Sequence, residues 1–318
     1  MTVVRWHVHT EHRLAIGGSG DLRAQEQLGL AAVTIAVAAW GFGNVLVKLT
    51  SFDGIVLSLY RLWAGFLVML VAMRVARMRL TLDALRQSLP GGLLFGVNVV
   101  MFFSALKLTS VADATLISAL QPAIVFVVAG PMFGERAGVR EIVWTAIALA
   151  GVAIVVLASA GTPAWSPLGD LLAFGAVLTF TGYFLASKRI RVSVGPVEYV
   201  AAMQLSAALV VTPIALASRQ HLGLGSPLDW VWLMSIVLFS GIGGHLLVNW
   251  AHRYVDVTVS SVMMLGVPVV GALAAWAVLD ESLGVLQVLG GAVTIAALAV
   301  IARAGVRAPA ASSPVADG

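Results

Sequence analysis

The chain has 318 residues, of which 60% are hydrophobic and only 11% are charged, with a mean hydropathy of +0.98 and a net charge of +4. A soluble domain usually carries about 25% charged residues, so these charges are too few to cover a water-facing surface. We therefore interpret the chain as a polytopic membrane protein. Its basic residues cluster between apolar segments, as membrane topology requires, and we expect no nucleic-acid partner. The absence of cysteine excludes disulfides, thiolate nucleophiles and cysteine-ligated metals.

Residues 1–27 are predicted to form a polar, flexible cytoplasmic leader. The segment contains no apolar run, so it is not a secretory signal peptide. It carries histidines at positions 7, 9 and 12. A short tract enforces no coordination geometry, so we favour a solvated leader over a metal site and expect no metal in the protein.

Ten apolar segments follow, each close to the roughly 20 residues that a helix needs to cross the hydrocarbon core. The runs are continuous, whereas barrel strands alternate in segments of about ten residues. The predicted fold class is thus an all-α integral membrane protein with ten transmembrane helices. These helices are expected at 28–49, 54–73, 89–107, 110–133, 139–160, 168–188, 196–217, 229–251, 257–279 and 283–303.

The distribution of basic residues predicts the orientation. With a cytoplasmic N-terminus, fifteen of the nineteen Lys and Arg residues fall on the cytoplasmic side, Lys48, Lys107 and Arg219 fall outside, and Arg61 lies within a span. This bias predicts a multi-pass protein of the cell (inner or plasma) membrane with both termini in the cytoplasm. The tail 304–318 is rich in Ala, Pro and Ser, and we expect it to be disordered.

A sequence motif occurs twice in the chain, as LQPAIVFVVAGPMFGERAG at 120–138 and as GVPVVGALAAWAVLDESLG at 266–284. A constant offset of 146 relates the two stretches, and it holds without gaps from position 105 to position 150. The chain therefore contains two repeats, 28–160 and 168–303. The equivalent motif residues are Pro122 and Pro268, Glu135 and Glu281, and Gly138 and Gly284.

Each repeat has five spans, and because five is odd the second repeat must cross the membrane in the opposite sense. Many secondary transporters use such inverted repeats, with a substrate site near the midplane. We therefore favour a secondary transporter working by alternating access. The alternatives are an integral membrane enzyme and a non-transporting assembly subunit. The sequence lacks the phosphate-binding motif G-x-x-x-x-G-K-[ST], so we do not expect ATP to drive transport. The loops contain no paired acid and base of the kind that an enzyme needs.

These features resemble the drug/metabolite transporter (DMT) superfamily, in particular its EamA-like ten-helix family. The resemblance rests on AVAAWGFGNVLVK, on LSLYRLWAG, and on both copies of the repeated motif with its upstream segment. It implies an exporter or exchanger of small metabolites, often amino acids, with a cavity lined mainly by spans 1, 3, 4, 6, 8 and 9 and no cofactor. The long leader departs from the family pattern, as does Gln204 at the position equivalent to Arg61.

Polar side chains within the spans are the candidate site residues, because a polar group at this depth usually faces a bundle interior or a wet cavity. The same residues can also serve as interhelical hydrogen-bond links. Aromatic residues and few fixed charges suit zwitterionic or aromatic compounds better than polyanions. The candidate cavity residues are Trp40, Asn44, Asn98, Ser118, Gln121, Thr179, Tyr183, His245 and Asn249.

His245 is the candidate for proton coupling, because its ordinary pKa of about 6.5 lies close to neutrality. A neutral, hydrogen-bonded histidine is the alternative. Arg61 is expected either to pair with Asp113 or to meet an anionic group of the substrate, and the structural ion pair is favoured.

The two midplane prolines, Pro122 and Pro268, are predicted hinges, because a proline removes a backbone hydrogen bond and frees carbonyls. Glu135 and Glu281 lie about 20 Å from these prolines by helical rise. They are predicted to anchor helix ends or gate the cavity mouth without touching cargo. The expected partners are a small-molecule substrate and the lipid bilayer, and the sequence allows a homodimer.

Overall fold

The structure is a computed structural model that describes residues 19–109, 114, 117–134, 138–159, 166–191, 193–218, 220, 222–279 and 284–305. The described residues form helices and no strand. In chain order the helices are α1 (Ser19–Leu49), α2 (Gly54–Val75), α3 (Leu82–Leu108), α5 (Gln121–Phe133), α6 (Val139–Ser159), α7 (Pro167–Ile190), α8 (Pro196–Ala217), α9 (Pro227–Ser235), η2 (Ile236–Gly244), α10 (His245–Ala251), α11 (Val257–Met263), α12 (Gly266–Leu279) and α13 (Val285–Gly305).

The chain is an all-α integral membrane protein. Within the described residues, nine helical segments are long and apolar enough to cross a membrane, and α5 is a shorter apolar helix at the end of the fourth predicted span. The helices α9, η2 and α10 together make one of the nine segments, as do α11 and α12. Asp113, Glu135, Glu281 and the two terminal segments 1–18 and 306–318 lie outside the described residues.

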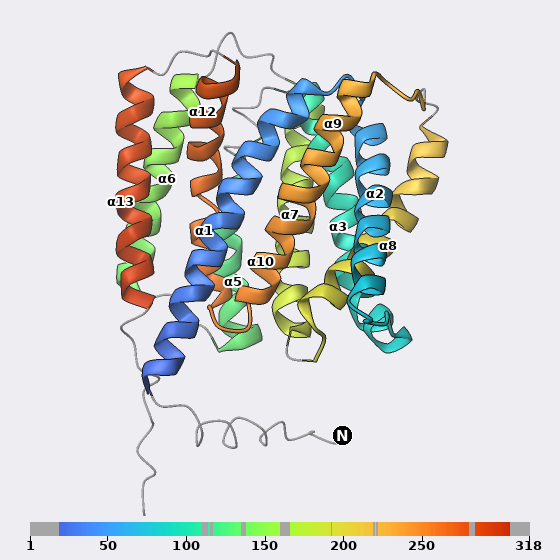
Figure 1. Cartoon of the computed structure of the whole chain (residues 1–318). Coiled ribbons are helices and arrows are strands. Elements are labelled where there is room, and N and C mark those ends of the chain that lie inside the picture. Colours follow the sequence, from blue (N-terminus) through green and yellow to red (C-terminus); the bar gives the residue numbers. More distant parts are fainter. Residues whose placement is uncertain are drawn as a thin grey trace, which may run out of the picture.

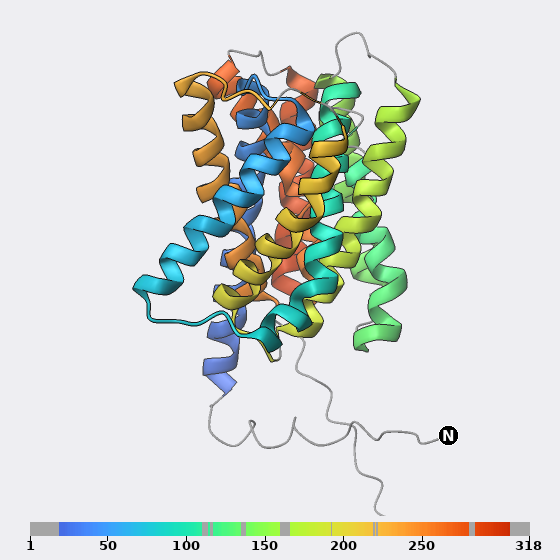
Figure 2. The ribbon, with the colours of Figure 1, turned by 90° about the vertical axis from the view of Figure 1, so that its right-hand side faces the viewer.

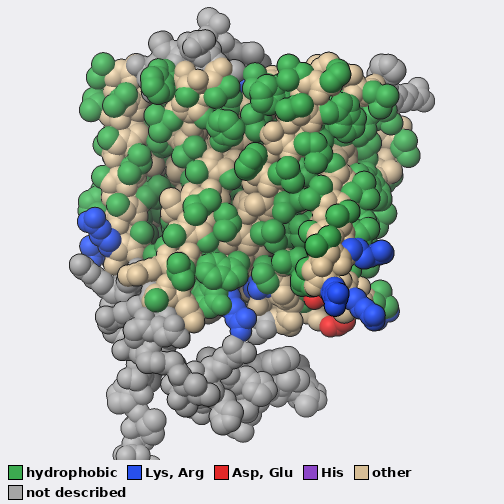
Figure 3. Space-filling model, in the orientation of Figure 1, with side chains coloured by type: hydrophobic (Ala, Val, Ile, Leu, Met, Phe, Trp, Pro, Cys, Tyr) green, Lys and Arg blue, Asp and Glu red, His purple; other side chains and the backbone are tan. Residues whose placement is uncertain are grey.

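The two repeats run in opposite directions (Figure 1). Helix α1 rises from the lower face in this view, whereas its counterpart α7 descends from the upper face. Helix α1 begins and α13 ends at the same lower face. Lys and Arg side chains gather along the lower part of the visible surface, and hydrophobic side chains cover the band above them (Figure 3). This arrangement is that of an inverted-repeat membrane protein with charges at its interfaces.

Two helices begin earlier than the sequence predicts. Helix α1 starts at Ser19, nine residues before the predicted span and inside the predicted leader. Helix α3 starts at Leu82, seven residues early, so Pro90 lies within the helix. The side chain of Thr81 accepts a hydrogen bond from the backbone N–H of Ala84 and so caps α3. Hydropathy detects the membrane-embedded part of a helix, whereas capping residues fix where the helix starts.

Helices α6 and α13 pack side by side at one edge of the bundle (Figure 1). Their contact includes Ala148 and Thr294, which are equivalent positions separated by 146 residues; the Thr294 hydroxyl lies 3.4 Å from the Ala148 carbonyl oxygen. One turn away Gly151 approaches α13 so closely that an added Cβ atom would lie 2.8 Å from the Gly290 carbonyl oxygen. Glycine is therefore required here for the two backbones to meet.

Elsewhere the repeats interlock. Helix α1 of the first repeat packs against η2 and α10 of the second, and α7 of the second packs against α3 of the first. Helix α2 runs obliquely across the bundle (Figure 2) and contacts its own counterpart, α8. Each repeat thus supplies part of the other's core, and the space between them is lined from both.

The two spans that carry the repeated motif are broken close to Pro122 and Pro268. A turn at Met264 and Leu265 separates α11 from α12, with hydrogen bonds from residue i to i−3. In the first repeat a turn at Ala119 and Leu120 precedes α5, which has Pro122 in its first turn. Proline lacks an N–H and so fits the start of a helix. Under the 146-residue offset the two breaks differ by one residue, since Ala119 corresponds to Leu265.

Replacing Gly151 with Val should destabilise the protein, because the larger side chain forces α6 away from α13. We expect a loss of about 1–3 kcal/mol, as is typical for overpacking, visible as a lower Tm in detergent. Gly195→Ala is the matched control, since an added Cβ atom there meets nothing within 4 Å. An unchanged Tm for Gly151→Val would contradict this helix packing.

Candidate functional site

A cavity lies between the two repeats and is lined by residues of α1, α2, α3, the start of α5, α7, η2, α10 and the break between α11 and α12. The cavity volume that is accessible to the centres of water molecules is about 160 Å³. This volume is well above the roughly 10–15 Å³ that a cavity needs to hold a single water molecule. That space suits a molecule of amino-acid size.

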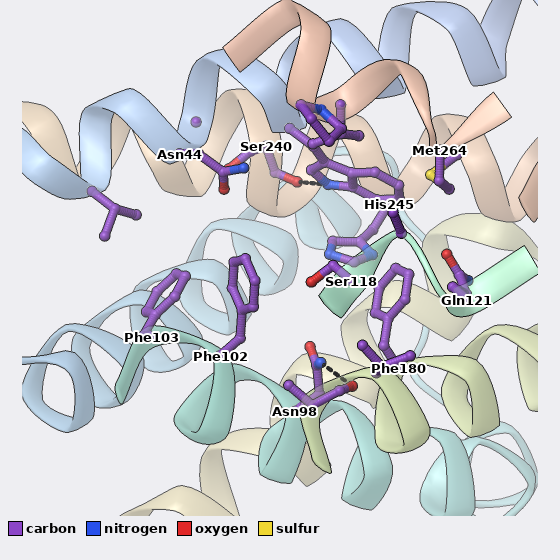
Figure 4. Close-up of a pocket in the computed structure, with 18 of the residues that line it drawn as sticks. Asn44, Asn98, Phe102, Phe103, Ser118, Gln121, Phe180, Ser240, His245 and Met264 are labelled. Carbon is purple, nitrogen blue, oxygen red and sulfur yellow. Dashed lines mark hydrogen bonds between the residues drawn. The ribbon is translucent and has the colours of Figure 1, made fainter. Parts of the chain in front are cut away.

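The cavity wall follows the internal symmetry. The two breaks contribute four pairs of lining residues that are 146 positions apart. In Figure 4, Ser118 and Gln121 come from the first break and Met264 from the second. The four pairs are Ser118 and Met264, Ala119 and Leu265, Gln121 and Val267, and Pro122 and Pro268.

The contact between α1 and η2 forms one wall. Segment η2 is a nine-residue π-helix, a rare conformation that is frequent at functional sites. The indole Nε1 of Trp40 donates a hydrogen bond of 2.8 Å to the Ser240 carbonyl. An added Cβ atom on Gly244 would lie 2.6 Å from Trp40 Nε1. The glycine therefore makes room for the tryptophan that faces the cavity.

Aromatic rings dominate the remaining wall. Phe102 and Phe103 lie toward one end of the cavity in Figure 4, and Phe180 lies toward the other. The rings of Trp40 and Phe180 meet edge to face with centroids 6.0 Å apart. Phe95 packs edge to face on His245, with ring centroids 4.6 Å apart. The polar part of the cavity wall is therefore small compared with its aromatic part.

Six of the nine predicted cavity residues line the cavity. Asn98 donates to the Ala176 carbonyl at 2.8 Å and links α3 to α7. Gln121 has a buried Nε2 with no hydrogen-bond partner in the part of the chain that the structure describes. Asn44 makes no hydrogen bond with another described residue. The six are Trp40, Asn44, Asn98, Ser118, Gln121 and His245.

The other three predicted residues are not among the lining residues. The hydroxyl of Thr179 bonds to the Gly175 carbonyl of its own helix at 2.9 Å. Tyr183 and Asn249 are fully buried behind His245. Their helical spacing places them near the cavity, but the helix rotation turns them away from its surface.

Arg61 also lines the cavity and is only 6% exposed. Its guanidinium carbon lies 5.3 Å from the Phe103 ring centroid and 5.7 Å from that of Phe95. Its Nε is buried and has no hydrogen-bond partner among the described residues. Among the described residues no carboxylate pairs with it, and the favoured partner, Asp113, lies outside them. The guanidinium of Arg61 therefore makes cation–π contacts with Phe95 and Phe103.

A chain of buried hydrogen bonds leads from His245 away from the cavity. Tyr183 Oη lies 2.9 Å from His245 Nδ1, and Asn249 Nδ2 donates to Tyr183 Oη at 3.0 Å. Ser187 Oγ donates to Asn249 Oδ1 and lies 3.0 Å from His252 Nδ1. The chain thus connects α10 to α7 through five side chains.

The hydrogen bonds assign the protons of this chain. The Asn249 amide N–H groups are used by Tyr183 Oη and by the His245 carbonyl, which is 2.7 Å away. Tyr183 then has only His245 Nδ1 as an acceptor for its own proton, which places the imidazole proton on Nε2. At the other end His252 Nδ1–H donates to Ser187. His245 therefore offers an N–H donor to the cavity.

Sequence reasoning missed Ser187, His252 and the π-helix. The first two lie at the ends of their spans, and hydrogen bonding between helices cannot be deduced from one helix's periodicity. The run SGIGGH at 240–245 is the available signal for the π-helix, because its small residues permit unusual backbone packing.

Comparison with known proteins identifies the chain. It matches the EamA-like transporter family over residues 27–157 and 167–303. It is 31% identical over 209 residues to the aromatic amino acid exporter YddG of Ancylobacter novellus, covering 60% of this chain and 68% of that protein. A solved crystal structure shares its fold, with a TM-score of 0.71 at 20% identity, over 89% of this chain and 99% of the other. The chain belongs to the EamA-like transporter family.

His252 should make stability depend on pH. Burial and then the charges of Lys188 and Arg191 lower the pKa of His252 well below 6.5. Below about pH 6.5 the unfolded chain binds a proton that the native His252 rejects, so stability falls as the pH falls. The loss approaches about 1.4 kcal/mol per pH unit.

The measurement is thermal or denaturant unfolding in detergent between pH 7.5 and 5. His252→Asn keeps an amide N–H near the Nδ1 position but cannot titrate, so its stability should decline less on acidification. Parallel pH profiles for the two proteins would contradict a buried, neutral His252.

Proposed function

We propose that this protein is a secondary transporter that moves small metabolites by alternating access around the cavity between its repeats. The observation that carries the proposal is the set of four lining pairs related by the 146-residue offset. A site built symmetrically from inverted repeats can be exposed to either side when the repeats exchange conformations. Membership of the EamA-like transporter family supports the same class of activity.

An asymmetry between the repeats supports two conformational states. Helix α1 packs closely along α12, and an added Cβ atom on Gly41 would lie 2.6 Å from Val270 Cβ. The equivalent pair, α7 and α5, makes far fewer contacts. Exchanging these two arrangements would close one side of the cavity and open the other. Pro122 and Pro268, at the two helix breaks, are the proposed hinges.

For the substrate we propose an amino acid or related compound with an aromatic or apolar body. The cavity has room for such a molecule, and its walls carry Trp40, Phe180 and the phenylalanines at the opposite end. Aromatic rings pack well on other aromatic rings. Similarity to YddG of Ancylobacter novellus, an aromatic amino acid exporter, supports this choice. By the same analogy we propose export or exchange across the cell membrane, with both termini cytoplasmic.

The direct test is transport by purified protein in liposomes, using radiolabelled tryptophan, phenylalanine, alanine and a nucleoside. We expect counterflow of the aromatic amino acids and little movement of the nucleoside. If no compound moves, the transporter proposal fails, and a non-transporting subunit or a membrane enzyme becomes the better interpretation.

Replacing Phe180 with Ala should weaken substrate binding, because it removes the ring that packs edge to face on Trp40. We expect KM for tryptophan to rise about tenfold, from the loss of an aromatic contact and its buried area. Phe239→Ala is the matched control, since that ring is 62% exposed and does not line the cavity. Equal effects of the two substitutions would contradict the proposed binding surface.

Proton coupling through His245 stays a prediction. If His245 exchanges a proton during transport, His245→Gln should abolish uphill transport driven by a pH gradient while substrate counterflow at equal pH persists. Both activities are measured in the same liposomes. Transport by His245→Gln that still follows the pH gradient would exclude this role.

A further inference from the structure

We propose that Arg61 and His245 together bind a carboxylate of the transported substrate at one end of the cavity. This inference rests on the proposed function and names the chemical group that the site recognises. The starting observation concerns Arg61, a cation that is only 6% exposed. Its guanidinium makes no hydrogen bond or ion pair with another described residue. A buried charge is costly unless it is paired.

The surroundings of Arg61 restrict where a partner can come from. Phe95 and Phe103 flank the guanidinium within 6 Å of their ring centroids. On the η2 side Gly241 leaves room, since an added Cβ atom would lie 3.5 Å from Arg61 Nε. Rings and a bare backbone offer the guanidinium no anion. The open direction is the cavity that Arg61 lines.

His245 supplies a second donor to the same region. Phe95 contacts both groups, lying 4.6 Å from the imidazole centroid and 5.7 Å from the guanidinium carbon. The buried hydrogen bond from Tyr183 occupies His245 Nδ1, which leaves Nε2–H for the cavity. Two N–H donors beside one ring, one of them charged, match the oxygens of a carboxylate.

The charge of the cavity wall favours a group with one negative charge as the partner of Arg61. Arg61 is the charged residue among the described lining residues, and none of them is Asp or Glu. A carboxylate neutralises this single cation, whereas a phosphate near neutral pH carries between one and two negative charges, and its excess charge would stay unpaired in an aromatic cavity. The aromatic walls then hold the apolar body of the same molecule.

The test compares compounds that differ in the carboxylate. Binding to the purified wild-type protein in detergent is measured by calorimetry with L-tryptophan, indole-3-acetate and tryptamine. We expect tryptophan and indole-3-acetate to bind and tryptamine, which has no carboxylate, to bind at least about tenfold more weakly. Arg61→Gln should lose the preference, and Arg61→Lys should retain part of it, because lysine keeps the charge without the fork of donors.

Equal binding of tryptophan and tryptamine by the wild-type protein would overturn the inference, even if Arg61→Gln fails to fold. Displacement of tryptophan by inorganic phosphate but not by acetate would equally overturn the choice of a carboxylate. Tyr183→Phe tests the positioning of His245. It should weaken tryptophan binding but not tryptamine binding, and should shift the ¹⁵N resonances of His245 toward the other tautomer.

The outcomes separate this inference from the proposed function. If the protein binds tryptophan over tryptamine but moves no compound in liposomes, the transporter proposal fails and the carboxylate site stands. If transport occurs with no preference for the carboxylate, the transporter proposal stands and the carboxylate site is wrong.

Discussion

Hydrocarbon cannot donate or accept a hydrogen bond, and this constraint organises the molecule. A backbone or side-chain polar group inside the bilayer must find its partner within the protein. Most of the chain meets the constraint with regular helices and with hydroxyls that bond back to their own turn, as Thr179 and Thr181 do. Several departures adjoin one cavity: the two helix breaks, the π-helix, Gln121 Nε2 and Arg61. Others do not, since buried polar atoms of Ser88, Gln204 and Ser260 also have no partner among the described residues, and these residues do not line the cavity.

The polar chain behind the cavity shows the cost of orienting one side chain. Three of its side chains are completely buried, and each forms hydrogen bonds with a neighbouring side chain: Tyr183, Asn249 and Ser187. Hydrogen bonds in a buried network restrict the orientation of the side chains that make them, although Nε2 of His252 at the far end has no partner among the described residues. Here the network holds one imidazole in a single tautomer against an aromatic wall. The cavity therefore combines a fixed donor with rings that tolerate different substrate bodies, which suits recognition of a shared polar group on varied molecules.

Much of the fold could be predicted because its signals are long and repeated. Apolar runs indicate the spans, and the constant offset between the proline motifs indicates two inverted repeats. The site was predictable in part, since polar residues such as Asn44 and Gln121 are conspicuous in apolar helices. The rest depends on how helices rotate against one another. Periodicity does not distinguish Asn98, which lines the cavity, from Asn249, which lies behind it, and it gives no indication that η2 departs from α-helical winding.

The contact between Ala148 and Thr294 has a geometric meaning. Two equivalent residues can touch only where the pseudo-two-fold axis passes between them, so that axis crosses the α6–α13 seam near this pair. Rotation about this axis swaps the two repeats and maps the Ala148–Thr294 contact onto itself. The same rotation maps the α1–α12 contact onto the α7–α5 contact. In the alternating-access cycle that we propose, this seam would therefore keep its packing while the α1–α12 and α7–α5 contacts exchange. The close glycine approach near this pair suits α6 and α13 to that stationary role.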